Sequence, residues 1–188
     1  MTEILALCTA NICRSPMAQA LLARELTARG ADAVVRSAGT LSGGVTPPPE
    51  VVTVMAGYGL DVGGHLSRQV TADDLARASL VLAMAREHLR QAVVIAPDTW
   101  PRAFTIRELV RRGAQLDAGP PGECLDEWLE RVHDGRSRMA LLGDSPHDDV
   151  DDPIGGPLTA YEETAGELAG LTAALASMAW TPASPVAR

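Results

Sequence analysis

The stretch that most constrains this chain lies between an apolar segment and a long helical pattern. Residues 5 to 16 read Leu-Ala-Leu-Cys-Thr-Ala-Asn-Ile-Cys-Arg-Ser-Pro. Five residues separate Cys8 from Arg14, so a loop that curls back on itself can aim successive backbone N–H groups at one centre. A phosphate dianion fits such a ring. The loop residues expected to bind it, together with Arg14, are Thr9, Ala10, Asn11, Ile12 and Cys13.

The residues around this loop suit catalysis as well as binding. A helix beginning at Pro16 would place the positive end of its dipole at the loop. Arg14 offers a planar fork of donors for two phosphate oxygens. The same groups favour a thiolate at Cys8, which would then be a nucleophile at neutral pH. Ser15 can give its hydroxyl proton to that sulfur, and Asn11 tolerates the positive φ of a tight loop.

The bare Cys-x5-Arg spacing is weak evidence, because three cysteines and 16 arginines produce it by chance about a quarter of the time. Its context is what makes it specific: an apolar strand over 3–7 runs into Cys8, and Ser-Pro opens a helix directly after Arg14. The alternative is that Cys8 is a small buried hydrophobe and Arg14 a surface residue.

The full string Cys-Thr-Ala-Asn-Ile-Cys-Arg-Ser-Pro resembles the signature of the low-molecular-weight protein tyrosine phosphatases. Two later segments, Ser-Ala-Gly-Thr from Ser37 and the His65 that precedes Arg-Gln, also resemble this family. The resemblance implies that Ser37 hydrogen-bonds to Asn11 and that His65 supports the same asparagine. It also implies that Cys8 and Cys13 can form a reversible disulfide under oxidant.

A carboxylic acid is needed above the loop to protonate the leaving group. Four acids occur within 148–152, and their mutual repulsion would raise at least one pKa. Asp152, followed by Pro153, resembles the general acid of the family, and Asp151 is the alternative. A solvated acidic loop or a divalent metal site would also fit the same residues.

The resemblance implies a two-step phosphatase in which Cys8 is phosphorylated and Asp152 acts as general acid and then base. Neither a metal nor an organic cofactor is implied. The expected partners are a phosphorylated protein or peptide as substrate and phosphate as product.

The residues expected to contact the substrate differ from the pattern of the family. Tyrosine phosphatases of this type flank the cleft with aromatic residues, where this chain has Gly43 and Ile154. Asp-Pro-Ile-Gly-Gly looks more like the Asp-Pro-Phe-Gly-Gly of protein-arginine phosphatases. Those enzymes carry Thr at the position of Ile12, however, and an apolar residue there favours packing against a tyrosine ring. Phosphotyrosine is therefore the preferred substrate and phosphoarginine the alternative.

Two other classes share parts of this pattern. Arsenate reductases of this fold use two further cysteines after the position of Met84, and this chain has none there. Cys124 is too isolated to fill both roles. A non-catalytic phosphate-binding module would need Cys8 or Asp152 to be dispensable.

Strand patterns alternate with helical patterns, which indicates a single α/β domain. We expect a four-stranded parallel sheet flanked by helices on both faces, with a helical insertion before the Asp-Pro loop. The expected strands are 3–7, 33–36, 79–84 and 103–106, and the expected helices are 17–29, 47–57, 71–77, 86–94, 107–112 and 158–179. The domain would span 1–180, with an insertion at about 113–150 carrying one helix at about 125–139, and a flexible tail over 181–188.

Composition excludes several other classes. A formal net charge of −8 argues against a broad basic surface for nucleic acid. The adjacent Arg111 and Arg112 are expected on a solvated face. No apolar run reaches the roughly 20 residues that cross a bilayer. The start shows no secretory signal, so we expect a cytoplasmic protein, with its three cysteines as thiols rather than a disulfide framework.

Overall fold

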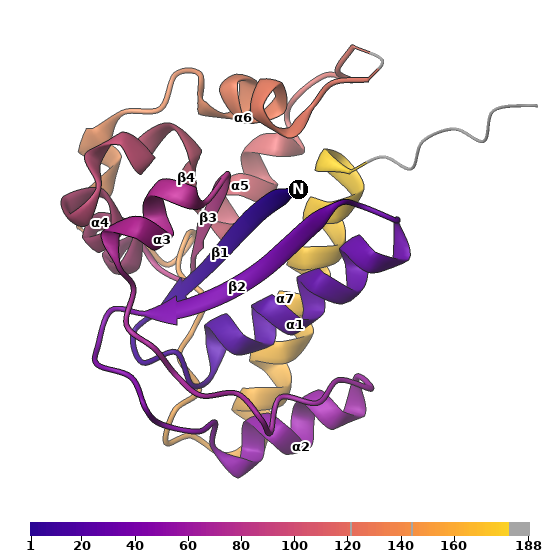
Figure 1. Ribbon diagram of the computed structural model, residues 1–188, viewed down its shortest axis with the longest axis vertical. Helices are drawn as coiled ribbons and strands as arrows, with labels where there is room; N and C mark the ends of the chain where they lie inside the picture. Colours follow the sequence, from indigo (N-terminus) through magenta and orange to yellow (C-terminus); the bar gives the residue numbers. More distant parts are fainter. Residues whose placement is uncertain (121, 144, 181–188) are drawn as a thin grey trace, which may run out of the picture.

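Parallel strands form the centre of the molecule (Figure 1). A computed structural model describes residues 1–120, 122–143 and 145–180. Within these residues the sheet has four strands in the order β2-β1-β3-β4, and the predicted parallel α/β domain is confirmed. The strands are β1 (Thr2–Cys8), β2 (Ala33–Gly39), β3 (Leu80–Ala83) and β4 (Ala103–Thr105).

The register of the sheet brings the ends of three strands together. β1 pairs with β2 from Thr2 opposite Ala33 to Cys8 opposite Gly39, and with β3 as far as Leu7 opposite Ala83. Because parallel strands all end at the same edge, the loops that follow them meet there. The loop that begins at Cys8 is at the centre of this edge.

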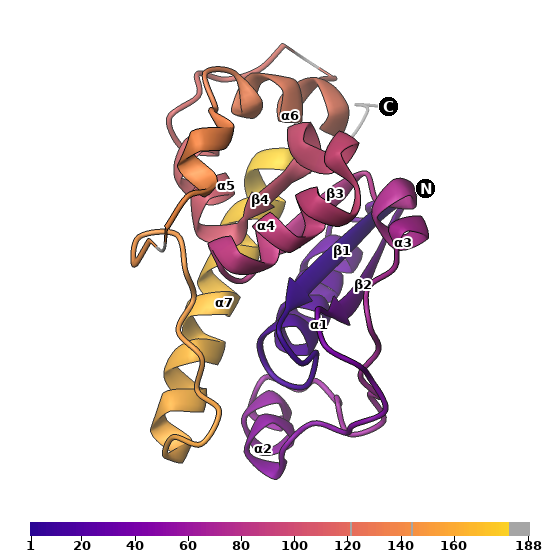
Figure 2. The same cartoon turned by 90° about the vertical axis from the view of Figure 1, so that its left-hand side faces the viewer.

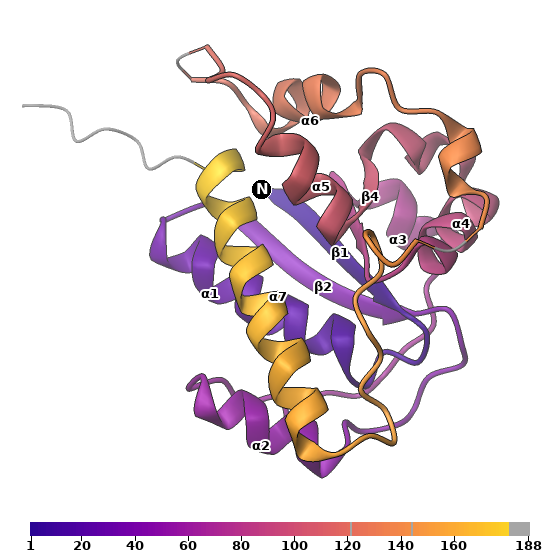
Figure 3. The ribbon, with the colours of Figure 1, turned by 180° about the vertical axis from the view of Figure 1, so that it is seen from behind.

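Helices cover both faces of the sheet, as expected. One apolar cluster joins the sheet to α1, α2, α5, α6 and α7, and a second joins it to α3, α4 and the 3-10 helices η1 and η2. Figure 3 shows α7 crossing in front of α1, and Figure 2 shows α2 below the loop that follows β1. The bounds are α1 Arg14–Ala28, α2 Pro49–Gly57, α3 Ala72–Arg77, α4 Arg86–Ile95, η1 Pro97–Arg102, α5 Ile106–Gly113, α6 Leu125–His133, η2 Arg138–Leu141 and α7 Leu158–Ala179.

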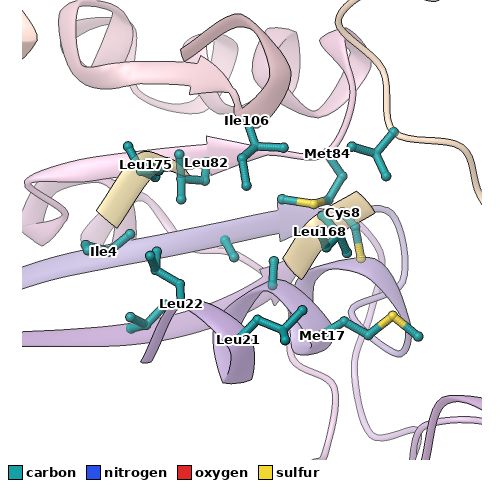
Figure 4. Close-up of a cluster of buried hydrophobic side chains, with 14 of the residues drawn as sticks. Ile4, Cys8, Met17, Leu21, Leu22, Leu82, Met84, Ile106, Leu168 and Leu175 are labelled. Atoms are coloured by element: carbon teal, nitrogen blue, oxygen red, sulfur yellow. The ribbon is translucent and has the colours of Figure 1, made fainter. Parts of the chain in front are cut away.

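The strand side chains alternate between the two clusters, as the two-residue period of a strand requires. Ile4 and Cys8 of β1 belong to the cluster on the α1 face, whereas Leu5 and Leu7 belong to the cluster on the α4 face. Figure 4 shows Cys8 at the end of β1, near Met84 and at the margin of the packed core. The predicted nucleophile is therefore held by core packing.

Some predicted boundaries were wrong. α1 begins at Arg14, two residues before Pro16, and α2 begins at Pro49. β2 continues to Gly39, so that Ser37 lies in a strand rather than in a turn. The single helix expected over 125–139 ends at His133, and Gly135 follows with a positive φ of 71°. Glycine adopts this left-handed conformation readily, so the chain leaves the helix there and η2 forms separately.

Arg111 is exposed, as expected, and Arg112 is half-buried, and both side chains also make contacts within the chain. The Arg112 side chain donates to the Val132 carbonyl at 2.8 Å, and Arg111 pairs with Asp148 at 2.6 Å. Both arginines therefore attach α5 to the segment that follows it.

Arg136 attaches the same segment to β4 and η1. Its guanidinium lies 4.0 Å from the ring centre of Trp100 and 3.8 Å from that of Phe104, and it makes a two-pronged hydrogen bond with Glu108 at 2.8 and 3.0 Å. The insertion boundaries of 113–150 remain a prediction. The predicted tail, 181–188, lies outside the described residues. In the part of the chain that the structure covers, every helix is too short or too polar to cross a bilayer.

Replacing Gly39 by alanine should destabilise the fold, because a Cβ built at Gly39 lies 2.7 Å from the Thr9 carbonyl oxygen. We expect the free energy of unfolding, measured by urea denaturation, to fall by about 1–3 kcal/mol. Gly57→Ala is the matched control, because an added Cβ at Gly57 meets no atom within 4 Å. A neutral or stabilising Gly39→Ala would contradict this account of the close approach.

Candidate active site

The loop between β1 and α1 surrounds a cavity at the carboxyl edge of the sheet. The cavity has a volume of about 200 Å³. Loop residues form its base and sides, and the later Asp-Pro segment contributes to its rim. The lining residues are Cys8, Thr9, Ala10, Ile12, Cys13, Arg14, Asp152 and Ile154.

Asn11 holds the loop in its curled conformation. It is fully buried and has a positive φ of 55°, which asparagine tolerates better than most residues. Its side-chain amide donates to Ser15 Oγ at 3.0 Å and to Ser37 Oγ at 2.8 Å. The predicted hydrogen bond between Asn11 and Ser37 is thus present.

Two further groups bind Asn11 from the segment before α3. His65 Nε2 lies 2.8 Å from the Asn11 carbonyl oxygen, and the Arg68 backbone N–H donates to Asn11 Oδ1 at 3.0 Å. The expected contact of His65 with this asparagine is therefore made through the main chain. With both ends of its side chain and its carbonyl bonded, Asn11 has little freedom to change the loop.

The Cys8 sulfur faces two hydrogen-bond donors. The Asn11 backbone N–H donates to Cys8 Sγ at 3.3 Å, and Ser15 Oγ lies 3.0 Å from the same sulfur. Ser15 Oγ accepts a hydrogen bond from the Asn11 amide, and its own proton has two acceptors in reach, Cys8 Sγ at 3.0 Å and the Ala38 carbonyl oxygen at 3.5 Å. A negatively charged sulfur would be stabilised by both donors.

Cys13 is chemically different from Cys8. Burial, followed by the negative charges of Asp152 and Cys8, raises the pKa of the Cys13 thiol to about 12. Cys13 therefore stays protonated at neutral pH and is a poor nucleophile. The disulfide implied between Cys8 and Cys13 stays a prediction, since both are free thiols in this structure.

Arg14 joins the loop to the segment that carries the predicted acid. Its buried guanidinium donates to the Val150 carbonyl at 3.0 Å and pairs with Asp152 Oδ2 at 2.5 Å. Asp152 is 44% exposed, so its carboxylate lies at the mouth of the cavity. Figure 3 shows the chain before α7 descending past the loop after β1, which brings these distant segments together.

The backbone around Asp152 is fixed by two local hydrogen bonds. The Ile154 N–H donates to Asp152 Oδ1 at 3.3 Å, and the Gly155 N–H donates to the Tyr161 hydroxyl at 3.3 Å. Tyr161 is almost fully buried in α7. The first turns of α7 therefore hold the Asp-Pro segment against the cavity.

Comparison with known proteins identifies the family of the chain. The family model described as low molecular weight phosphotyrosine protein phosphatase matches residues 3–135. The chain belongs to this family. Its members are hydrolases, and the fold of this chain is that of a solved member of the family.

Relatives come from two kinds of phosphatase. The chain is 44% identical over 136 residues to a probable low molecular weight protein-tyrosine-phosphatase, EpsP, of Ralstonia nicotianae, covering 70% of this chain and 89% of EpsP. It is 28% identical over 177 residues to a protein-arginine-phosphatase of Bacillus subtilis, covering 93% and 94%. The crystal structure of a low molecular weight protein tyrosine phosphatase from T. tengcongensis matches with a TM-score of 0.72 and 32% identity, over 94% of this chain and 99% of that one.

The acids near the cavity are not the mutually repelling cluster expected from the sequence. Asp148 is buried and pairs with Arg86 at 2.7 Å and Arg111 at 2.6 Å. Burial by itself would raise the pKa of Asp148, but the hydrogen bonds from these arginines outweigh it and hold the pKa below its usual value. Asp149 accepts from the Arg86 backbone N–H at 2.7 Å. These two acids therefore fasten the segment to α4.

Sequence reasoning missed some groups that shape this site. Arg68 binds Asn11 through its backbone N–H. Every residue except proline has this group, so the residue type at position 68 could not indicate the contact. His88 lies on the first turn of α4 and contacts the Thr9 hydroxyl at 2.9 Å. Only the packing of α4 against the loop reveals this contact. Within the described ranges, no three His, Cys, Asp or Glu side chains gather closely enough to hold a metal ion.

Replacing Asp148 by asparagine tests whether its ion pairs with Arg86 and Arg111 stabilise the fold. We expect the variant to lose about 1–3 kcal/mol of unfolding free energy at pH 7, as measured by urea denaturation. Because the pKa of Asp148 is lowered on folding, its contribution is complete above the unfolded pKa of about 3.9 and is lost as pH falls through the folded value.

The stability difference between wild type and Asp148→Asn should thus be constant above about pH 5 and shrink in stronger acid. Asp98→Asn, at an exposed position, is the control and should change stability little. If the stability difference between wild type and Asp148→Asn grew as pH fell, the stabilising role of these ion pairs would be contradicted.

Proposed function

We propose that this chain hydrolyses phosphotyrosine in proteins through a phosphocysteine intermediate on Cys8. One arrangement carries the proposal: Cys8, Arg14 and Asp152 line the same cavity, and the Cys8 sulfur has donors at 3.0 and 3.3 Å. Such a site favours an anionic sulfur next to a bound dianion. A nucleophile, a charge-stabilising group and a proton donor are the three parts that phosphate transfer to cysteine needs.

In the first step, the loop N–H groups and Arg14 bind the phosphoryl oxygens. The phosphoryl group then competes with Asp152 for the Arg14 guanidinium, so substrate binding frees the Asp152 carboxyl group to carry a proton. Cys8 Sγ attacks phosphorus in line, the bond from phosphorus to the ester oxygen breaks, and Asp152 gives its proton to that oxygen.

In the second step, the Asp152 carboxylate takes a proton from water as the water oxygen attacks phosphorus. The bond between sulfur and phosphorus breaks, and the electron pair returns to Cys8 Sγ. Ser15 stabilises the departing thiolate, since its hydroxyl lies 3.0 Å from that sulfur. Phosphate leaves and the free thiolate is restored.

The apolar lining of the cavity suits an aromatic leaving group. Ile12 and Ile154 give the lining an apolar wall, on which a tyrosine ring can pack without unpaired polar groups. The B. subtilis protein-arginine-phosphatase, related over 93% of this chain, is the observation that favours phosphoarginine as the second candidate. Ile12 is the residue that weighs against it, because a hydroxyl would suit a guanidinium better.

Substrate preference is tested by side-by-side assays on phosphotyrosine and phosphoarginine peptides. We expect a higher kcat/KM for phosphotyrosine, and a smaller ratio between the two substrates in Ile12→Thr. Cys8→Ser should abolish turnover of both, which shows that the activity belongs to this site. Comparable or reversed kcat/KM values in the wild type would overturn the phosphotyrosine assignment in favour of phosphoarginine.

The acid is tested by replacing the neighbouring aspartates one at a time. Asp152→Asn should lower kcat by about 10² to 10⁴, with the greatest loss for substrates with poor leaving groups, which depend most on protonation. Asp151→Asn is the matched control, because Asp151 is an exposed neighbour that does not line the cavity. If Asp151→Asn had the larger effect on kcat, the acid would have to be reassigned.

A further inference from the structure

One wall of the cavity is built on a buried histidine that the mechanism above does not use. Thr9 lines the cavity directly after Cys8, and its hydroxyl lies 2.9 Å from His88 Nε2. His88 is completely buried in the first turn of α4. Burying an imidazole is costly unless its polar atoms are bonded, so this contact calls for an explanation beyond packing.

The surroundings of His88 determine which ring nitrogen carries a proton. Glu87 Oε1 lies 3.1 Å from His88 Nε2, and a carboxylate oxygen can only accept. His88 Nδ1 has no hydrogen-bond partner among residues 1–120, 122–143 and 145–180. A proton on Nδ1 would leave a buried donor unpaired and turn the Nε2 lone pair toward the carboxylate. The proton therefore belongs on Nε2.

His88 has only this one ring proton at working pH. Burial, followed by the positive charges of Arg14 and Arg90, lowers the pKa of His88 to about 3. The ring is therefore neutral, and its closeness to Glu87 is not an ion pair. A neutral ring that is protonated on Nε2 has two acceptors in reach, and it donates to the nearer one, Thr9 Oγ1 at 2.9 Å, rather than to Glu87 Oε1 at 3.1 Å. This hydrogen bond occupies one lone pair of the Thr9 hydroxyl.

The Thr9 hydroxyl must then give its own proton to another acceptor. In this structure the acceptor is Glu87 Oε1, at the long distance of 3.4 Å. Glu87 is 53% exposed, so its side chain is free to turn away. A phosphoryl group bound on the loop would offer a charged oxygen as a better acceptor, because hydrogen bonds to ionised groups are shorter and stronger.

We propose that His88 is a positioning residue that fixes the Thr9 hydroxyl as a hydrogen-bond donor to the phosphoryl group of the substrate. The inference rests on the proposed function for its substrate, but it assigns a role to residues outside the nucleophile, the arginine and the acid. Thr9 would touch the substrate directly, and His88 would act only through Thr9.

A double-mutant cycle tests this coupling, with Thr9→Val, His88→Leu and the pair combined. Each single variant should lower kcat/KM on a phosphotyrosine peptide, and weaken inhibition by inorganic phosphate, by about tenfold. The double variant should be no worse than either single variant, because both remove the same hydrogen bond to phosphate. His88→Gln should recover part of the loss, since its side-chain amide can still donate to Thr9.

Thr99→Val is the matched control. Thr99 is also a fully buried threonine, its hydroxyl has no partner in the described part of the chain, and it lies in η1 away from the cavity. This variant should leave both kcat/KM and phosphate inhibition unchanged. If the losses from Thr9→Val and His88→Leu instead add in the double variant, His88 acts on packing alone and the proposal fails.

The proton position in the wild-type protein is tested without any substitution. Two-bond ¹H–¹⁵N NMR spectra of the histidine rings at neutral pH should show His88 protonated on Nε2. Protonation on Nδ1 would overturn the proposal, because the Thr9 hydroxyl would then donate to His88 and not to phosphate.

These readouts separate the inference from the proposed function. The NMR spectra and the binding of inorganic phosphate, measured by calorimetry, need no turnover. If the wild type hydrolysed neither phosphopeptide, the proposed function would fall, while coupled losses of phosphate affinity in the cycle would still support the role of His88.

Discussion

The reversed backbone at Asn11 is the constraint on which the rest of the site depends. Its positive φ turns the loop so that the N–H of Asn11 reaches the Cys8 sulfur. The conformation is held by three hydrogen bonds: the Asn11 amide donates to Ser15 of α1 and to Ser37 of β2, and Asn11 Oδ1 accepts from a backbone N–H in the segment that precedes α3. The conformation of this loop therefore cannot be formed by local sequence alone. It is completed only when the sheet and its connections have assembled around one asparagine.

The first turn of α4 contacts the chain segments on both sides of the cavity. The backbone and side chain of Arg86 bind Asp149 and Asp148, which fastens the segment that leads to Asp152. The next two residues, Glu87 and His88, contact the hydroxyl of Thr9 on the loop. The Val150 N–H also donates to the Met84 carbonyl at 2.8 Å, directly before this helix. One short helical turn thus contacts both the loop that follows Cys8 and the segment that leads to Asp152.

The cavity has a polar side and an apolar side, and the two sides can contact different parts of a substrate. Thr9 brings a hydroxyl to one side, whereas Ile12 and Ile154 contribute only hydrocarbon. Tyrosine phosphatases of the type that this chain resembles flank the cleft with aromatic residues, whereas this chain has Gly43 and Ile154 at those places, and Ile154 lines the cavity. Aliphatic side chains can still cover a tyrosine ring, but they lack the ring-on-ring geometry that adds specificity. The apolar side of the cavity can therefore cover a ring but cannot stack on it with an aromatic one.

Much of the fold and the loop could be predicted from the sequence because the determinants are local. The apolar run of β1, the spacing from Cys8 to Arg14 and the alternation of strand and helix patterns lie within short windows, and each has a direct physical reading. The capping box at Thr71 is another local signal, and α3 begins directly after it. The parallel sheet with helices on both faces followed from these patterns.

Only the tertiary structure decided which charged and polar groups from distant parts of the chain become partners. The acids at 148–152 look alike in sequence, yet their partners differ. Asp148 forms ion pairs with Arg86 and Arg111, whereas Asp152 pairs with Arg14. His88 has no motif around it, and its contact with Thr9 joins residues 79 positions apart. The strength and direction of a charge–charge or hydrogen-bond interaction depend on distance and burial, and both are set by packing rather than by the order of residues.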